Sequence, residues 1–341
     1  MTIDQTFSSP APSEANGQDL RAVIVLGPTA TGKTRLGVDL ARRFNGEIVS
    51  ADSRQVYRGM DIGTGKDLNE YGSGADRVPV HLVDLIHPMQ TYHLFHYLKD
   101  ARTALRGIVN AGKQAFIVGG TPLYINALLE NYKMEGGPPT QDLRRTLEQL
   151  GREQLLVKLQ QEAPDIYERT DKTQRKRILR GLEIARTRGH NDSDLPELRL
   201  NALLIAPYYH RKTVHARIEK RLEQRLQKGL VEEVQSLHDK EGLTWERLQS
   251  FGLEYRYVAR CLMGELTVED MRAQLLAKIR RFAKSQDVWF RKMEREGKDI
   301  YWIPKGDPDK AAKYVEQFLR GDKLPPPMLR LKDRLYGPRA N

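Results

Sequence analysis

Residues 21–66 read RAVIVLGPTATGKTRLGVDLARRFNGEIVSADSRQVYRGMDIGTGK, and this stretch decides the fold. It begins with an apolar run at 22–26 that is typical of a buried parallel strand. The run leads into G-P-T-A-T-G-K-T at 27–34, which matches the phosphate-loop pattern G-x-x-x-x-G-K-[ST] at every fixed position. Apolar residues then recur every four positions from Leu36 to Phe44 and predict an amphipathic helix. Strand, loop and helix follow in the order that a phosphate loop requires.

The loop predicts a binding site for a phosphoanhydride. Its glycines let the backbone close around a phosphate and turn several N–H groups inward, and the start of the following helix adds a favourable dipole. Lys33 adds a positive charge, and Thr34 offers a hydroxyl to a magnesium ion. The residues expected at the phosphates are Gly27, Pro28, Thr29, Ala30, Thr31, Gly32, Lys33 and Thr34. The alternative is a glycine turn between a core strand and a core helix, without a ligand.

A carboxylate follows the next apolar strand. Residues 47–50 read E-I-V-S, and Asp52 comes shortly after them. Since open α/β sheets bind ligands outside the carboxyl ends of their strands, Asp52 is expected to face the group held by the phosphate loop. A nucleotidase would also need an apolar strand that ends in a magnesium-binding Asp, but the candidate at 115–120 ends in glycines and is followed by Thr121. This argues for a loop that holds a phosphate for chemistry other than simple ATP hydrolysis.

Three motifs together resemble a known family. They are the phosphate loop at 27–34, D-S-R-Q-V-Y-R-G-M-D-I-G-T at 52–64 and V-G-G-T-P-L-Y at 118–124. In this order and at these intervals they resemble the tRNA dimethylallyltransferases, which are isopentenyl transferases of the phosphate-loop class. The similarity continues more weakly to about Pro304. The sequence has no zinc finger of the kind added in eukaryotic relatives, so it resembles the bacterial form.

Composition and net charge limit the classes of protein to which this chain could belong. Of 341 residues, 39% are hydrophobic and 30% are charged, which suits one large domain or a core domain with an insertion. A single cysteine, Cys261, excludes an intramolecular disulfide and a cysteine-rich zinc site. No apolar run approaches the roughly 20 residues of a membrane span, and residues 1–18 lack the pattern of a secretory signal, so we expect a cytoplasmic protein without a membrane partner. The net charge of +11 predicts attraction to polyanions.

The expected fold is a doubly wound parallel α/β sheet like that of P-loop NTPases, because strand and helix patterns alternate along the chain. The sheet core and its C-terminal helices are expected at 21–131 and 195–304. Between them, residues 132–194 have helical patterns without strand signals, which predicts a helical insertion. The resemblance implies that this insertion binds tRNA. Residues 1–20 are expected to be a flexible tail and residues 305–341 a loose basic tail.

Positive charge is concentrated in the predicted insertion. Residues 172–188 contain seven Lys or Arg residues and one acid. Lys176, Arg177 and Arg180 leave the apolar stripe of this helix and lie within one turn of one another. A solvated helix face is the ordinary alternative. The pattern K-R-x-x-R resembles a family segment that touches tRNA, so the resemblance implies contacts with the RNA backbone.

A second cationic strip is formed by Arg217, Arg221 and Arg225, which recur every four residues. Solvated arginines again provide the ordinary explanation. In the family an arginine of the motif R-I-x-x-R binds the diphosphate, and R-I-E-K-R at 217–221 matches it, so the resemblance implies this role for Arg217.

Two later segments match the family pattern only approximately. S-F-G-L-E-Y-R at 250–256 stands where the family usually has a shorter I-G-Y-[KR] turn, and we assign it no catalytic role. The run at 280–291, R-x-x-A-K-x-Q-x-x-W-x-R, is close to a family signature. In it, Arg280 and Lys284 could reach phosphates.

The resemblance implies transfer of a dimethylallyl group from dimethylallyl diphosphate to N6 of the adenosine beside a tRNA anticodon. Lys33, Arg217 and magnesium would stabilise the charge that develops on the leaving diphosphate. Asp52 would be the general base for an adenine that has left its stack. The residues expected to contact tRNA are Asp52, Ser53, Arg54, Gln55, Thr121, Lys176, Arg177 and Arg180. We expect a monomer.

Three other functions are compatible with parts of the pattern. The same transfer could use free AMP or ATP, as in the cytokinin-forming isopentenyl transferases, but a mononucleotide needs no basic insertion. A small-molecule kinase would hold ATP in the loop and would require ATP for its product. A nucleic-acid-binding module without catalysis would leave the phosphate loop and Asp52 unexplained.

Overall fold

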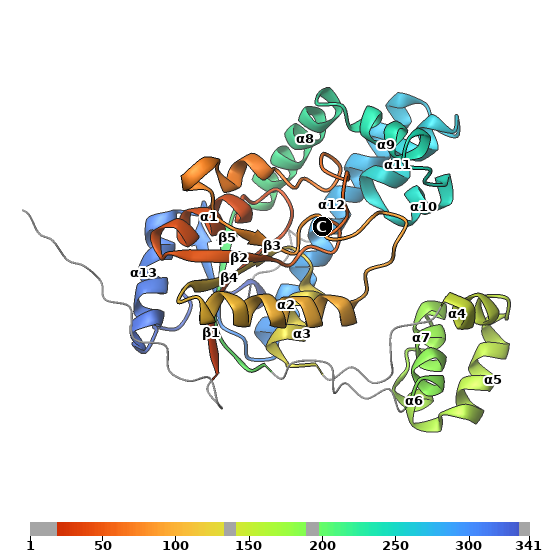
Figure 1. Ribbon diagram of the computed structural model, residues 1–341, viewed down its shortest axis with the longest axis horizontal. Helices are drawn as coiled ribbons and strands as arrows, with labels where there is room; N and C mark the ends of the chain where they lie inside the picture. Colours follow the sequence, from red (N-terminus) through yellow and green to blue (C-terminus); the bar gives the residue numbers. More distant parts are fainter. Residues whose placement is uncertain (1–18, 133–140, 189–197, 334–341) are drawn as a thin grey trace, which may run out of the picture.

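The computed structural model describes residues 19–132, 141–188 and 198–333 (Figure 1). Within these residues six strands form one sheet of order β3-β2-β4-β1-β5-β6, in which every neighbouring pair is parallel. The strands are β1 (Leu20–Leu26), β2 (Gly46–Ser50), β3 (Val80–His81), β4 (Gln114–Gly119), β5 (Leu200–Tyr208) and β6 (Ile300–Pro304). The predicted parallel α/β sheet is confirmed.

The central strand β1 is apolar throughout its buried part because both faces of the sheet are covered. Its alternate residues belong to two separate apolar clusters. Ala22, Ile24 and Leu26 lie in one cluster, and Val23 and Val25 lie in the other. This division follows from the two-residue period of a strand.

Helices cover both faces of the sheet (Figure 1). α2 (Leu94–Asn110) and α3 (Pro122–Leu129) contribute to the cluster on the first face. α1 (Lys33–Arg43) and α13 (Pro308–Arg320) contribute to the cluster on the second face. The arrangement is that of a doubly wound sheet, and it leaves the carboxyl ends of the strands for other elements.

The C-terminal segment differs from the sequence prediction. Residues 305–341 were expected to be a loose basic tail, but residues 308–320 form α13, and Ala311, Ala312 and Val315 of this helix are buried against the sheet. Two of the three buried residues are alanines, so the apolar stripe of the helix is inconspicuous beside the charged residues around it. The prediction was wrong for this helix.

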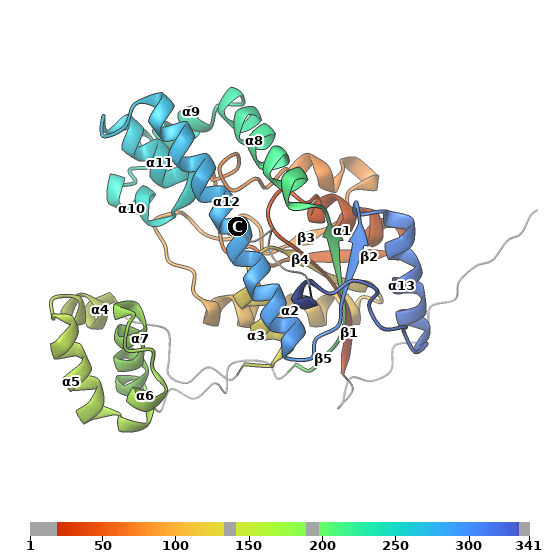
Figure 2. The ribbon, with the colours of Figure 1, turned by 180° about the vertical axis from the view of Figure 1, so that it is seen from behind.

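A second layer of helices lies at the carboxyl side of the sheet (Figure 2). It contains α8 (Arg211–Gln227), α9 (Leu230–Asp239), α10 (Trp245–Ser250), α11 (Leu253–Leu262) and the N-terminal part of α12 (Val268–Arg295). Val56, Tyr57 and Met60, from the segment after β2, are buried in the same apolar cluster. The motif at 52–64 therefore joins the sheet to the helical layer. Short 3₁₀ helices occur at η1 (Leu68–Tyr71), η2 (Gly74–Asp76) and η4 (Leu331–Asp333).

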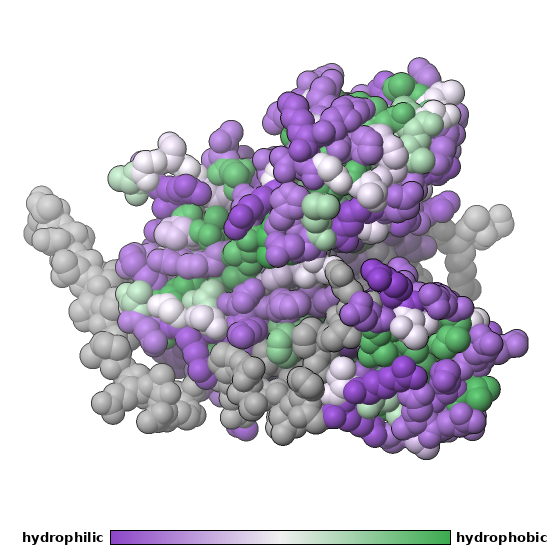
Figure 3. Space-filling model, turned by 45° about the vertical axis from the view of Figure 1, so that its right-hand side comes forward, coloured by the Kyte–Doolittle hydropathy of each residue, from purple (hydrophilic) through white to green (hydrophobic). Residues whose placement is uncertain are grey.

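One face of the molecule is shown in space-filling form in Figure 3. Hydrophilic side chains cover most of it, and apolar side chains form patches between them. In the part of the chain that the structure describes, no helix combines the length and the apolar character needed to cross a bilayer.

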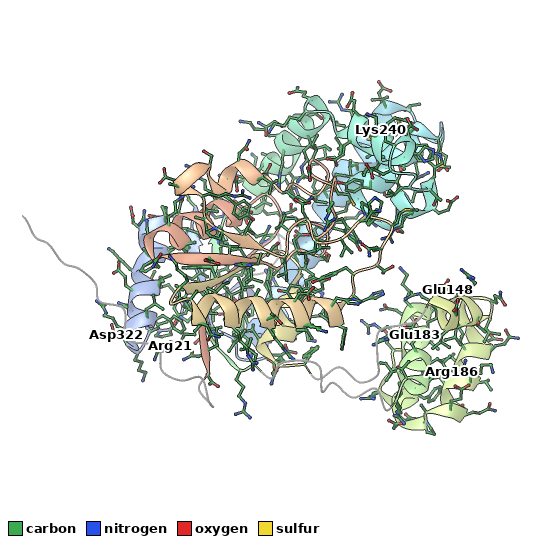
Figure 4. The ribbon with its side chains drawn as sticks, in the orientation of Figure 1. Arg21, Glu148, Glu183, Arg186, Lys240 and Asp322 are labelled. Atoms are coloured by element: carbon green, nitrogen blue, oxygen red, sulfur yellow. The ribbon has the colours of Figure 1, made fainter. Side chains whose placement is uncertain are left out.

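The helical insertion lies apart from the sheet in both ribbon views (Figures 1 and 2). Its described residues form α4 (Gln141–Glu148), α5 (Arg152–Glu162), α6 (Pro164–Arg169) and α7 (Arg175–Arg186), which pack around an apolar cluster of their own. Glu183 of α7, labelled in Figure 4, is buried beside Arg144 at 3.6 Å and Arg180 at 3.4 Å. The insertion was expected to extend from 132 to 194. The first limit lies beside 133–140 and the second lies within 189–197. Both of these ranges, like 1–18, are outside the residues that the structure describes.

A buried carboxylate connects three elements near the C-terminus. Glu294 of α12 is fully buried, and its Oε1 accepts hydrogen bonds from Nε1 of Trp302 at 2.7 Å and from the N–H of Leu331 at 3.1 Å. Its Oε2 accepts from the N–H of Lys332 at 2.7 Å. The side chain thus joins α12 to β6 and to η4.

We expect Glu294→Ala to lower the free energy of unfolding by about 2–4 kcal/mol, because buried donors that now meet a carboxylate would be left unpaired. The measurement is urea denaturation followed by circular dichroism. Glu296→Ala is the matched control, since Glu296 is exposed and forms a long ion pair with Lys292, at 3.5 Å, on the same helix end; its effect should stay below about 0.5 kcal/mol. Equal effects of the two variants would contradict the anchoring role of Glu294.

Candidate active site

A cavity of about 550 Å³ lies where the carboxyl ends of β1, β2 and β4 meet the helical layer. The phosphate loop contributes Thr29, Lys33 and Thr34 to its wall. The segments after β2 and β4 contribute Asp52, Ser53, Arg54, Gln55, Gly119, Gly120 and Thr121. The structure therefore brings together the three motifs that stand far apart in the sequence.

The phosphate loop has the open backbone that an anion site needs. Gly27 and Gly32 have φ of 146° and 79°, in the region that favours glycine. Thr31 is buried, and its hydroxyl donates to the carbonyl of Pro28 at 2.9 Å, which closes the loop on itself. Because α1 begins at Lys33 directly after Gly32, the first N–H groups of the helix adjoin the loop.

Gln286 of α12 connects the phosphate loop to the loop after β4. Its Oε1 accepts from the N–H of Thr29 at 2.9 Å, and its Nε2 donates to the carbonyl of Gly120 at 2.6 Å. The side chain is 3% exposed. A Cβ on Gly120 would lie 2.8 Å from this Nε2 and 3.1 Å from Cε of Lys33, so a larger residue here would displace the ends of these two side chains. Gln286 was not predicted as a site residue; its signal in the sequence is an amide on the buried stripe of α12.

Asp52 is oriented by a local turn. Its Oδ1 accepts from the N–H of Arg54 at 2.9 Å, and the N–H of Ser53 donates to Oγ1 of Thr121 at 3.0 Å. The second contact ties the segment after β2 to the segment after β4. Gln55 is buried, and its amide accepts from Oγ of Ser50 at 3.1 Å and donates to the carbonyl of Gly65 at 3.2 Å. Asp52, Ser53 and Arg54 thus line the cavity on a framework held by Gln55 and Thr121.

Two ionisable side chains, Lys66 and Glu233, hold the rest of the segment 52–66 in place. Lys66 is 1% exposed and donates to the carbonyl of Tyr57 at 2.7 Å, to Oδ1 of Asp61 at 2.6 Å and to Asp84. Glu233 of α9 accepts from the N–H groups of residues 61, 62 and 63, at 2.8, 2.7 and 3.0 Å. The loop is therefore held from both the sheet side and the helical side.

The arginine strip of α8 reaches the cavity at Arg221 and Arg225. Arg225 pairs with Glu254 at 2.5 Å and donates to the carbonyl of Gly63 at 3.2 Å. Arg221 pairs with Asp67 at 2.9 Å. Burial lowers the pKa of the Arg221 guanidinium, and the nearby Arg225 lowers it further.

Arg217 does not line this cavity. It lines a second cavity of about 680 Å³, which shares Lys33, Thr34 and both other arginines of the strip with the first. Arg217 is exposed, and its guanidinium lies 3.9 Å from the ring centroid of Tyr209. The role expected of Arg217 at the diphosphate therefore stays a prediction. Arg221 and Arg225 line the cavity that contains Asp52, and all three arginines line the second cavity.

The segment at 250–256 forms part of the cavity wall. Phe251 is buried, with its ring centroid 4.9 Å from that of Tyr57 and 5.7 Å from Cζ of Arg54. Leu253 begins α11 with a φ of 40°, which is a left-handed backbone conformation that is energetically unfavourable for leucine. The segment that departs from the family turn therefore forms part of the cavity lining.

The basic residues of α12 at the cavity are Lys278 and Arg281. Arg280 points to α8, where it pairs with Glu219 at 2.8 Å, and Lys284 lines a different cavity beside α8. Arg280 and Lys284 are thus outside the lining of this cavity, and their contact with phosphates stays a prediction. Lys176, Arg177 and Arg180 lie on α7 of the insertion, where Arg177 pairs with Asp171 at 3.1 Å.

Lys33 is the titratable group at the centre of the cavity. Burial lowers its pKa to about 8, while the charge of Asp52 opposes this shift and the charge of Arg221 adds to it. The ammonium is therefore mostly protonated at neutral pH and loses its charge as the pH rises above 8. Its charge is available for an anion in the loop at neutral pH.

These features define a class: a phosphate-loop enzyme whose cavity is also lined by a carboxylate and two arginines. A family model described as IPP transferase matches residues 55–293, and another described as isopentenyl transferase matches residues 20–86. The chain is 43% identical over 304 residues to tRNA dimethylallyltransferase 1 of Geotalea uraniireducens, covering 89% of this chain and 98% of that protein. It is 45% identical to tRNA dimethylallyltransferase 1 of Syntrophus aciditrophicus, covering 85% and 95%. The chain belongs to the IPP transferase family.

Solved structures agree with this assignment. The crystal structure of a full-length tRNA isopentenylpyrophosphate transferase from Bacillus halodurans is 31% identical, with a TM-score of 0.62 over 89% of this chain and 96% of that chain. A eukaryotic dimethylallyltransferase acting on tRNA shares the fold at 20% identity, with a TM-score of 0.73 over 89% and 80%.

The arginine strip gives a first test at this site. Arg221→Ala should weaken binding of inorganic pyrophosphate about ten- to a hundredfold, because a charge-assisted contact contributes about 1.5–3 kcal/mol. Arg217→Ala, on the same helix and one turn away, should change the affinity less than about threefold. Isothermal titration calorimetry measures both, and thermal melting verifies the folding of each variant. A larger loss for Arg217→Ala would assign the anion to the second cavity.

The pKa of Lys33 gives a second test. Affinity for pyrophosphate should fall as the pH rises through about 8, by up to tenfold per pH unit, because the free protein then binds the anion without the ammonium charge. Lys33→Met should bind more weakly and lack this inflection, so that only the titration of pyrophosphate itself remains. Parallel pH profiles of the two proteins would contradict the assignment.

Proposed function

We propose that this protein transfers a dimethylallyl group from dimethylallyl diphosphate to N6 of the adenosine next to a tRNA anticodon. The products are N6-dimethylallyladenosine in tRNA and diphosphate. The observation that carries the proposal is the single cavity lined by the phosphate loop and, opposite it, by Asp52. The relatives named tRNA dimethylallyltransferase, at 43–45% identity over most of the chain, support the same reaction.

The diphosphate would bind at the phosphate loop. In the reaction the bond between C1 of the dimethylallyl group and the diphosphate oxygen breaks, and negative charge accumulates on the diphosphate. The loop N–H groups, Lys33, Arg221 and Arg225 are preorganised donors and charges around that position, and such groups stabilise a leaving anion without reorganisation. We assign the arginine role to Arg221 and Arg225, since Arg217 faces the second cavity.

Magnesium fits the donors present at the loop. Thr34 and Asp52 line the cavity with hydroxyl and carboxylate oxygens, which are the ligand types that magnesium prefers. We propose that Thr34 holds the ion together with the diphosphate oxygens. When bound, magnesium supplies further positive charge at the leaving group.

Asp52 would receive the proton of the acceptor. The new bond joins N6 of adenine to C1 of the dimethylallyl group, and the proton released from N6 passes to the Asp52 carboxylate. Because Oδ1 already accepts from Arg54, the second oxygen of Asp52 is the one suited to the amine. Ser53 and Arg54 would lie beside the base, whereas Gln55 and Thr121 would act by holding this segment in place.

A tRNA acceptor accounts for features that a mononucleotide would not require. An anticodon-loop adenine must leave its stack to enter a cavity of this kind, and proteins that modify bases extrude them in this way. The insertion carries Lys176, Arg177 and Arg180 on α7, which would contact the RNA backbone. The net charge of +11 favours binding of the polyanion tRNA. The protein would act on tRNA as a monomer in the cytoplasm.

A direct test incubates the protein with magnesium and dimethylallyl diphosphate, and with either unmodified tRNA or AMP, in the absence of ATP. Mass spectrometry of the products should find one dimethylallyl group added to tRNA and none added to AMP. Prenylated AMP would support the adenylate alternative, and a product that forms only with ATP would support a kinase.

Asp52→Asn should lower the turnover of tRNA at least a hundredfold, because the amide keeps the shape of the side chain but accepts no proton. Binding of tRNA should change less than about twofold in a filter-binding assay. Asp76→Asn, in η2 and away from the cavity, is the matched control and should keep full turnover. Substantial turnover by Asp52→Asn would assign the proton to another group.

A further inference from the structure

Two carboxylates lie next to the arginines of the candidate active site. Glu254 of α11 is buried, lines the cavity of about 550 Å³ and pairs with Arg225 at 2.5 Å. Glu233 of α9 is partly buried and accepts hydrogen bonds from the backbone of residues 61–63. Negative charge at these places opposes the binding of a diphosphate, because like charges repel. The two side chains therefore need a role other than direct contact with an anion.

The backbone of Gly63 connects the two carboxylates. Its N–H donates to Oε1 of Glu233 at 3.0 Å, and its carbonyl accepts from Nη1 of Arg225 at 3.2 Å. The same Nη1 donates to Oε1 of Glu254, so this nitrogen is held between a carbonyl and a carboxylate. A change in the contact with Glu233 would thus be transmitted through one residue to the guanidinium of Arg225.

Tyr255, which follows Glu254 in α11, joins the same group. It is 2% exposed, and its hydroxyl donates to Oε1 of Glu233 at 2.7 Å. Burial raises the pKa of Tyr255 and the charge of Glu233 raises it further, so the phenol stays protonated and remains a donor. A Cβ on Gly63 would lie 2.5 Å from Cζ of this tyrosine, so the loop and the ring are in close contact. We call Glu233, Glu254 and Tyr255 the positioning cluster.

Arg221 and Arg225 require such support because their charges repel. Both guanidinium groups lie so close to Gly65 that a Cβ there would overlap Nη2 of each. Each arginine has its own carboxylate: Arg221 pairs with Asp67 at 2.9 Å, and Arg225 pairs with Glu254. An arginine side chain also has considerable rotamer freedom, and fixing it in advance lowers the entropic cost of holding an anion.

We propose that Glu233, acting with Glu254 and Tyr255, positions Arg225 at the cavity, so that its charge is in place when the diphosphate leaves. Preorganised charges stabilise a leaving anion because they need no rearrangement during the reaction. The segment 250–256 thereby has a role in the reaction, although none of its residues was predicted to be catalytic. The proposal rests on the transfer reaction proposed above and adds residues that act through Arg225.

The direction of a change in affinity distinguishes positioning from simple charge. Glu233→Gln and Glu254→Gln each remove a negative charge and keep the shape of the side chain. If the carboxylates acted only through their charge, both variants would bind inorganic pyrophosphate more tightly. We expect each to bind it about tenfold more weakly, because a neutral amide holds the surrounding donors less strongly than a carboxylate does. Isothermal titration calorimetry measures the dissociation constants.

Glu232→Gln is the matched control. Glu232 precedes Glu233 in the first turn of α9, but it is exposed and lines neither cavity that contains Arg225. The same charge is lost, and the affinity should stay within about twofold of that of the original protein. Calorimetry also separates a folding defect from a defect of the site, since an unfolded fraction lowers the stoichiometry and leaves the affinity of the folded protein unchanged.

Tyr255→Phe keeps the ring and removes one donor from the positioning cluster. It should weaken pyrophosphate binding about threefold without lowering the stoichiometry, because one hydrogen bond to a charged group is lost. This variant decides the question if the glutamine variants do not fold. An affinity equal to that of the original protein would then overturn the proposal.

An Arg225→Gln background tests whether the cluster acts through Arg225. The amide that this change introduces still donates hydrogen bonds but brings no charge to the anion. Adding Glu233→Gln to this background should change the affinity for pyrophosphate less than about twofold, since residues that act through one another are not additive. A further tenfold loss in this background would overturn the proposal. So would single variants Glu233→Gln and Glu254→Gln that bind pyrophosphate as tightly as the original protein or more tightly.

Transfer to tRNA is measured with the same preparations. Absence of transfer by the original protein would overturn the proposed function, whereas pyrophosphate binding tests the positioning cluster without an acceptor. Where the original protein is active, Glu233→Gln should lower kcat as well as raise KM for dimethylallyl diphosphate, since the guanidinium charge matters most when the leaving group ionises. An unchanged kcat/KM would overturn the role of the cluster alone.

Discussion

The parallel pairing of β1 with β4 and of β4 with β2 is the constraint on which the site depends. Val118 of β4 is in register with both Val25 of β1 and Ser50 of β2, so the three strands end at the same level. Neighbouring strands are about 4.8 Å apart, which separates the phosphate loop from the segment of Asp52 by about 10 Å. That gap leaves room for a diphosphate, a transferred group and the edge of a base between them.

The helical layer converts this sheet edge into a cavity. Gln286 holds two of the strand-end loops through opposite ends of one amide, so α12 cannot move without disturbing the phosphate loop. Glu233 and Lys66 immobilise the segment that carries Asp52. These hydrogen bonds include buried and partly buried ones, and a partner lost from such a contact leaves a costly unpaired group. The rigidity of the site therefore depends on elements from the whole chain.

The local parts of this arrangement could be predicted from the sequence because each one has its own pattern. The phosphate loop is defined by glycines at fixed spacing, and Asp52 and Thr121 each follow an apolar strand pattern. Parallel strands bring their carboxyl ends to one edge, so the grouping of these residues followed from general rules. The motif R-I-x-x-R does not show which cavity each of its arginines lines. Residues four apart in a helix are rotated by about 40° from one another, and Arg221 lines both cavities whereas Arg217 lines the second alone.

The sequence by itself determined the class of fold, the phosphate loop, the carboxylate opposite it and the helical character of the insertion, because these depend on local spacing and on strand and helix periodicity. Tertiary structure alone decided which arginines line the cavity beside Asp52, that Gln286 joins two loops, and that residues 308–320 pack on the sheet. Each of these depends on the rotation and position of one helix against another element. Such placement is set by the packing of side chains distant in sequence, which no local pattern contains.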